Sequence, residues 1–417
     1  MRPSFMRHAG RIALLAFVLP AGMVGYSFFT HEVIIDLAWE DSIKPLLLTR
    51  YPASSPAELR IAQSYAYGGS IIQDLGYYPF GSELFSDLAH YVRTGDFVRS
   101  LISQSSDLNE LAFAIGALSH FAADTSGHQG VNLSVALAFP TIEPAFGHEV
   151  TYEQDKKAHL RVEFGFDMYQ VVKGRYAQQD YHEHIGFRVA RPLLERAFLQ
   201  TYGIPFRRVF KHPELAIGSY RFAISKMLPE ITRAALLNRR DQLAERSDFA
   251  EKQFLFSISK AAYRQEWGSD YERPGIGSRI LAFFLRRAPK NGALTALDFV
   301  NPTTQTEDYF VKSVDASLRR YREFLGSEQD GSLILRNFNF DTGRDVLPSD
   351  YGLADNAYAQ LVVMLAGDSF SAVTPELKQN ILSFYSRGEP RTTREPAKWQ
   401  EITQALAQLR SIGDRRN

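Results

Sequence analysis

Two pairs of a histidine and a carboxylate residue stand at helical spacing in the first half of the chain. Asp124 follows His120 after four residues, and Glu163 follows His159 at the same interval. Residues four apart on a helix project from the same face, so each imidazole and its carboxylate can converge on one ion. The same spacing also produces ordinary surface salt links, but His128, four residues after Asp124, adds another imidazole beside them. We therefore interpret this stretch as a metal centre, because imidazole and carboxylate are ordinary zinc ligands.

Three more residues of the same types precede this stretch. Asp74 and His90 are separated by an aromatic loop at residues 76–81, and His31 lies closer to the N-terminus. The chain of 417 residues contains no cysteine, which excludes disulfides, thiolate metal ligands and thiol nucleophiles. Any metal must therefore be held by His, Asp or Glu. A Gly-x-Ser-x-Gly motif is also absent from the sequence, so a serine hydrolase is disfavoured.

In their order along the chain, these residues resemble the zinc-dependent phospholipase C family, which shares its fold and trinuclear zinc site with fungal single-strand nucleases. Members carry an N-terminal Trp, a nearby His, an Asp and a His, then His-x3-Asp, a further His, and finally His-x3-Glu or His-x3-Asp. The corresponding residues here are Tyr26, His31, Asp74, His90, His120, Asp124, His128, His159 and Glu163. The resemblance covers residues 26 to about 165, roughly a third of the chain.

The resemblance implies up to three zinc ions. The first would be held by Asp74, His90, His120 and Asp124, and the second by His128, His159 and Glu163. The third would be held by His31, the bridging Asp124, and the free amine and carbonyl of Tyr26. In the family, the Asp that matches Asp74 also contacts the attacking water, so Asp74 is the expected catalytic residue as well as a ligand.

Three positions depart from the family pattern. Tyr26 stands where the family has Trp. His128 follows Asp124 after four residues, whereas the family more often has six, so His148 remains a competing ligand. Asp87, three residues before His90, competes with Asp74.

The first 25 residues have the pattern of a secretory signal peptide. Three arginines and no acidic residue are followed by the apolar run at residues 12–19 and then by Pro20. The alternative is an uncleaved membrane anchor, since the apolar stretch can be extended to Phe29. Lys and Arg together number 47, and Asp and Glu together also number 47. Removal of the signal peptide with its three arginines would leave 44 basic residues against 47 acidic ones. We expect a secreted or periplasmic, mildly acidic protein.

Helical signals dominate the rest of the chain. Ser55 to Glu58 and Asp107 to Glu110 each have the residue types of a capping box. Apolar residues recur at intervals of three and four in residues 33–48, 193–198, 222–237, 310–325 and 357–365. These patterns predict an all-α fold, and the resemblance implies a multi-helix phospholipase C or nuclease-like fold with a helical C-terminal extension. The expected division is a phospholipase C-like domain at residues 26–240 and a helical region of unassigned role at 241–417, because residues 238–248 are the most charged stretch.

The expected function is metal-assisted hydrolysis of a phosphoester. The preferred hypothesis is a secreted phospholipase C with a small-molecule or phospholipid substrate, which leaves contact with a membrane surface open. One alternative is a nuclease or 3′-nucleotidase on the same zinc site, although the charge balance argues against long nucleic acid as a partner. Another is a non-catalytic binding protein that zinc stabilises.

Overall fold

The computed structural model describes residues 28–173, 176, 185–224, 228 and 298–413. The helices up to residue 103 are α2 (Phe28–Ala38), the π-helix η1 (Trp39–Ile43), α3 (Lys44–Arg50), α4 (Pro56–Gly69), the 3-10 helix η2 (Ile72–Tyr77), α5 (Glu83–Tyr91) and α6 (Thr94–Ser103). They are followed by α7 (Leu108–Ala138), α8 (Glu143–Phe146), α9 (Lys156–Val172), α11 (Arg191–Tyr202), α12 (Phe206–Val209) and α13 (Pro213–Phe222). The last are α19 (Thr304–Gln329), α20 (Gly352–Gly367), α21 (Pro375–Ser386), the 3-10 helix η5 (Arg391–Arg394) and α22 (Pro396–Ser411).

The predicted helix starts are confirmed, with one difference in detail. Ser55 and Glu58 form the complete capping box at the start of α4. At the start of α7, the Asp107 carboxylate accepts the backbone N–H groups of Asn109 and Glu110. The Glu110 side chain, however, accepts from the N–H of Ser106 rather than from that of Asp107. The predicted partner of the Glu110 side chain is therefore wrong by one residue, although the helix still begins as predicted.

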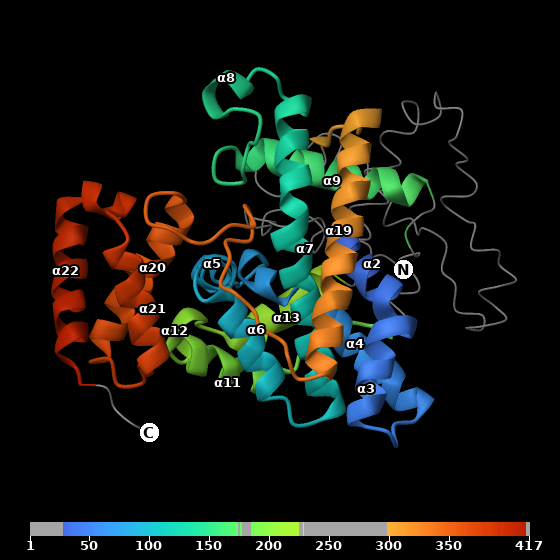
Figure 1. Ribbon diagram of the computed structural model, residues 1–417, viewed down its shortest axis with the longest axis horizontal. Coiled ribbons are helices and arrows are strands. Elements are labelled where there is room, and N and C mark those ends of the chain that lie inside the picture. The colour runs from blue at the N-terminus through green and yellow to red at the C-terminus, as the bar shows by residue number, and fades with distance from the viewer. Residues whose placement is uncertain (1–27, 174–175, 177–184, 225–227, 229–297, 414–417) are drawn as a thin grey trace, which may run out of the picture.

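Helix α7 forms the centre of the molecule. Its residues from Leu111 to Asp124 are all buried, as the apolar sequence of this stretch predicts. Helix α19 lies along it in the opposite direction, because Tyr321 donates to the carbonyl of Ile115 while Ser317, four residues earlier, donates to that of Ala123 (Figure 1). Residues of α4, α7 and α19 belong to the same apolar core.

Helices α4 and α7 approach each other closely at a glycine. A Cβ atom on Gly69 would lie 2.0 Å from the carbonyl oxygen of Phe113 in α7. Its neighbour Gly68 is equally tight, since a Cβ there would lie 1.8 Å from the carbonyl oxygen of Arg188. The Gly68-Gly69 pair thus allows backbone contact. This contact brings the end of α4 against the part of α7 that carries the metal-ligand candidates.

The described part of the chain contains no strand, only an isolated bridge between Phe338 and Asp345, so the all-α fold class is confirmed. Helix α20 packs against α5 and α22, and the group of α20, α21 and α22 lies at one end of the molecule (Figure 1). None of the described helices is long and apolar enough to cross a membrane. The expected domain boundary near residue 240 lies outside the described residues and stays a prediction, as does the helical pattern at residues 229–237.

Candidate metal centre

Eight of the nine residues expected at the site lie together at the middle of the fold. His31 comes from α2, Asp74 from η2 and His90 from α5; α7 carries His120, Asp124 and His128, and α9 carries His159 and Glu163. Each of these eight residues is at most 3% exposed. The ninth, Tyr26, lies outside the described residues.

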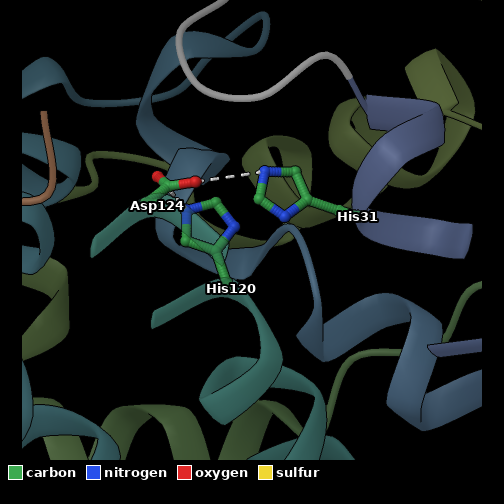
Figure 2. Close-up of side chains that lie close together, drawn as sticks. All are labelled: His31, His120 and Asp124. Carbon is green, nitrogen blue, oxygen red and sulfur yellow. Dashed lines mark ion pairs between the residues drawn. The ribbon is translucent and has the colours of Figure 1, made fainter. Parts of the chain in front are cut away.

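Asp124 is at the centre of this group. Its Oδ2 atom lies 3.2 Å from Nε2 of His120 and 3.7 Å from Nε2 of His90. Its Oδ1 atom lies 3.5 Å from Nε2 of His31 and 3.8 Å from Nε2 of His128. Figure 2 shows the imidazoles of His31 and His120 beside the Asp124 carboxylate, with the ion pair between His31 and Asp124 marked. Each carboxylate oxygen thus faces two imidazoles, which is the geometry of a group that can bridge two ions.

Two smaller groups flank Asp124. On one side, Oδ1 of Asp74 lies 3.2 Å from Nε2 of His90. Ligand atoms of Asp74, His90 and His120 lie within 4.8 Å of one another, as do those of His31, His120 and Asp124. On the other side, Oε1 of Glu163 lies 3.1 Å from Nδ1 of His159.

His128 belongs to the centre and His148 does not. Nε2 of His128 lies 3.8 Å from Oε1 of Glu163, besides its approach to Asp124. The His148 side chain is 87% exposed and pairs with Glu143 at the surface. The geometry therefore favours His128 despite its short interval from Asp124.

Asp74 likewise fits the centre better than Asp87. Its Oδ1 atom faces His90 directly, whereas Asp87 is only partly buried on α5 and forms no ion pair with an imidazole. Burial raises the pKa of Asp87 to about 7, partly offset by His90 and Lys156. Asp87 is thus a poorly solvated carboxyl group near the centre rather than a member of it.

The outer nitrogens of four histidines contact oxygen atoms that can only accept a hydrogen. In three of them the donor is Nδ1 and the acceptor is a backbone carbonyl. His90 donates to Ser86 at 2.7 Å, His120 to Ser70 at 2.9 Å and His128 to Phe340 at 3.1 Å. The fourth donor is Nε2 of His159, which lies 2.9 Å from the side-chain oxygen of Asn132. In a neutral imidazole the other nitrogen is then an acceptor. All four remaining nitrogens face the carboxylates, so lone pairs converge on the centre.

Helix α2 brings His31 into this centre through its N-terminus. The carboxylate of Asp167 on α9 accepts the backbone N–H of Phe29 at 3.0 Å and the hydroxyl of Thr30 at 2.8 Å. This carboxylate satisfies a donor at the start of the helix, where the helix dipole favours negative charge. The imidazole of His31 then stacks on that of His120 with ring centroids 4.3 Å apart.

The charges of the centre are strongly coupled when protons are the only cations. Burial disfavours the imidazolium forms of His120 and His128, but the Asp124 carboxylate outweighs it and raises the pKa of each to about 9. Burial and the neighbouring His128 lower the pKa of His159 to about 3. Burial also raises the pKa values of Asp74 and Glu163. The site therefore holds protons where a metal ion would otherwise neutralise the carboxylates.

The donor set fits zinc. Both carboxylate oxygens of Asp124 and of Glu163, Oδ1 of Asp74 and Nδ1 of His159 are buried and make no hydrogen bond. Buried polar atoms are normally hydrogen-bonded, and such a cluster is explained when a cation binds there. Nitrogen and oxygen ligands of these types suit zinc, with bond lengths of about 2.0–2.2 Å.

A family comparison agrees with this geometry. Residues 30–212 match the family model described as zinc dependent phospholipase C. Over this stretch the chain is similar to the zinc-dependent phospholipase C family. The phospholipase C segment, as we call residues 30–212, contains the eight ligand candidates from His31 to Glu163 and extends the resemblance beyond residue 165. Curated proteins and solved structures give no significant match.

Sequence reasoning missed two residues beside the ligand candidates. Asp341 is fully buried, with Oδ1 3.4 Å from Nδ1 of His128. Asn132 donates from its side-chain nitrogen to the backbone carbonyl of Asp341 at 2.8 Å, which also fixes its oxygen toward His159. Asp341 lies in the loop between α19 and α20, within the region 241–417 whose role the sequence left unassigned. No local signal places a loop beside a histidine more than 200 residues earlier in the chain.

Proposed function

We propose that the protein is a secreted phosphodiesterase that uses up to three zinc ions to hydrolyse the phosphodiester bond of a phospholipid. The observation that carries the proposal is the convergence of bare, buried carboxylate oxygens and imidazole nitrogens around Asp124 within a phospholipase C segment. A site with this donor set leaves positions for water and substrate oxygens, as catalytic zinc sites do.

We assign the side chains to the three ligand groups that the family pattern implies. His90, His120 and Asp74 lie on one side of Asp124, with His128, His159 and Glu163 on the other. His31 approaches Asp124 from α2, where the backbone of Tyr26 would complete the third group. Bound zinc supplies Lewis-acid polarisation of a phosphoryl oxygen and a lower pKa for water.

Asp74 is the residue we assign to the attacking water. Its Oδ1 atom accepts no hydrogen bond and lies in a buried position beside His90. Without a bound metal, burial raises the pKa of Asp74 above its ordinary value. Asp74 would orient water toward the phosphorus atom and accept its proton.

A cavity of about 460 Å³ lies near the centre and could take a polar head group, although none of the eight ligand candidates is among its lining residues. Asn132, which contacts a ligand histidine, forms part of its wall. Two ion pairs also line it, Arg344 with Glu149 at 2.9 Å and Arg391 with Glu153 at 2.6 Å. Charges of both signs on the wall suit a substrate that is itself charged and polar.

The rim of the same cavity carries an apolar side chain. Phe146 on α8 lines the cavity and is 38% exposed. An exposed aromatic ring beside a polar cavity suits a substrate that has both a head group and acyl chains. This arrangement supports contact with a membrane surface during turnover.

The test is a substrate panel. The purified, zinc-loaded protein is incubated separately with phosphatidylcholine vesicles, single-stranded DNA and 3′-nucleotides, and the released products are quantified. We expect diacylglycerol and a phosphorylated head group from the vesicles. Asp74→Asn should lose most of this activity together with part of its zinc, because Asp74 is also a ligand candidate. Turnover of DNA or 3′-nucleotides without turnover of phospholipid would replace the proposal with the nuclease alternative. Zinc binding without turnover of any of the three would favour the binding protein.

A further inference from the structure

Two neighbouring residues from the C-terminal part of the chain cover the metal centre. Phe340 and Asp341 lie in the segment between α19 and α20, far beyond the end of the phospholipase C segment at residue 212. The backbone N–H of Phe340 donates to the carbonyl of His90 at 3.1 Å. Its ring packs on those of His90 and His120, with centroids 5.0 and 5.9 Å away. The loop is therefore attached directly to the ligand residues.

Asp341 contacts the second group of ligands in two ways. Its carboxylate lies 3.4 Å from Nδ1 of His128, the nitrogen that points away from Asp124 and Glu163. Its backbone carbonyl accepts a hydrogen bond from Asn132, and the oxygen of the same Asn132 amide accepts from His159. One residue thus acts on both histidines of this group.

The Asp341 side chain is itself held in place. Its Oδ2 atom accepts hydrogen bonds from the hydroxyl of Tyr91 at 2.8 Å and from that of Tyr351. Its backbone N–H donates to the side-chain oxygen of Asn339 at 2.9 Å, which closes the turn that presents it. The residue is fully buried. A buried carboxylate with this many fixed contacts is oriented rather than mobile.

We propose that Asp341 is a positioning residue of the metal centre, which orients His128 through its carboxylate and His159 through Asn132. The Phe340 carbonyl already accepts the Nδ1–H of His128 and fixes its tautomer. The nearby Asp341 carboxylate adds a negative charge beside this outer N–H, which strengthens the inner nitrogen as a metal ligand. Asp341 lies on the outer side of His128, so it acts through that residue and is not itself a zinc ligand. The C-terminal region thereby completes a centre whose ligands all come from the first part of the chain. This inference rests on the zinc binding of the proposed function, but not on the choice of substrate.

The experiment compares zinc affinity in four full-length proteins by competition with a chromophoric chelator. These are the wild type, Asp341→Asn, Tyr351→Phe and the control Asp345→Asn. Asp345 lies in the same loop as Asp341, is exposed and forms an ion pair with Arg336. We expect Asp341→Asn to weaken one zinc site by about 10–100-fold and Asp345→Asn to leave all sites unchanged. Tyr351→Phe keeps the charge of Asp341 but removes the hydroxyl that donates to Asp341 and accepts the backbone N–H of Glu153. Its loss of zinc affinity should therefore be smaller and in the same direction.

Cobalt substitution separates positioning from simple structural support. At saturating cobalt, the visible absorption bands of Asp341→Asn should differ from those of the wild type, because the field of the His128 and His159 ligands changes. Asp345→Asn should have the wild-type spectrum. If Asp341→Asn fails to fold, the zinc affinity and the cobalt spectrum of Tyr351→Phe test the inference instead. Wild-type zinc affinity and spectrum in the variants would overturn the inference alone, whereas a wild type without zinc affinity would overturn the proposed function and the inference together.

Discussion

Asp124 lies one helical turn after His120, and its Oδ2 atom is 3.2 Å from Nε2 of that histidine while its Oδ1 atom faces the opposite side of the centre. This makes Asp124 the one described carboxylate that contacts four imidazoles, those of His31, His90, His120 and His128. Glu163 contacts only His128 and His159.

Asp124→Asn should therefore be more damaging than Glu163→Gln. Both substitutions keep the size of the side chain and remove one negative charge, but Asp124 can bridge two ions while Glu163 serves one. We expect Asp124→Asn to lose two zinc equivalents and Glu163→Gln to lose one, with a correspondingly larger loss of activity. Metal analysis at equal protein concentration measures this. Equal losses, or full occupancy in Asp124→Asn, would mean that the bridge is misassigned.

His120→Ala and His159→Ala should each lose zinc together with activity. The two histidines belong to different ligand groups, so each variant should lose at least one zinc equivalent and most of the turnover. His148→Ala is the matched control, because this side chain lies at the surface. Chelation should lower the melting temperature of the wild type, since ligands from several helices couple metal binding to folding. Unchanged zinc content in both variants would contradict the site.

Asp87→Asn should retain zinc and be more stable than the wild type above pH 7. Burial raises the pKa of Asp87 from 3.8 to about 7 in the folded protein, so the folded state holds a proton that the unfolded state has released. Stability of the wild type therefore falls as pH rises from about 4 to 7, and the loss stays constant above this window. Asn removes the titration and should gain on the order of 1–3 kcal/mol at pH 8, since partial exposure reduces the full value of the shift.

Thermal denaturation of the two proteins at pH 4 and pH 8 measures the Asp87 effect. Their stabilities should be similar at pH 4 and differ at pH 8. Loss of zinc in Asp87→Asn would instead identify Asp87 as the ligand in place of Asp74.

Gly69→Ala should weaken both the fold and the centre. The added methyl group would meet the Phe113 carbonyl and push α4 away from α7, and with it the Ser70 carbonyl that orients His120. We expect a loss of about 1–3 kcal/mol in the free energy of unfolding and weaker zinc binding. Gly218→Ala in α13 is the control: nothing lies near its added Cβ, so stability should rise by about 0.4–1 kcal/mol. Chemical denaturation of both variants tests this, and a neutral Gly69→Ala would show that the helices can separate without cost.

The mature chain should start at Tyr26. The third ligand group needs a free α-amine five residues before His31, and an amine binds metal once it is deprotonated. Mass spectrometry of the exported protein determines the N-terminus. A start upstream of Ala21, or an uncleaved chain, would remove the third zinc site in the form proposed here.

The sequence by itself determined the parts of the centre that depend on local geometry. His120 with Asp124, and His159 with Glu163, meet at 3.2 and 3.1 Å because the helical repeat places residues four apart on one face. The helix starts at Ser55 and Asp107 follow equally local capping rules. The order of the remaining ligands was recognisable from the family pattern.

Only the tertiary structure decided between His128 and His148, and only it revealed Asp341. Both histidines follow Asp124 along the chain, but the packing of α7 against α9 carries His128 toward Glu163 and leaves His148 exposed. Asp341 reaches His128 because α19 lies along α7 and returns the chain to the ligands. Such contacts depend on how distant helices pack, and no short-range pattern of residues encodes that packing.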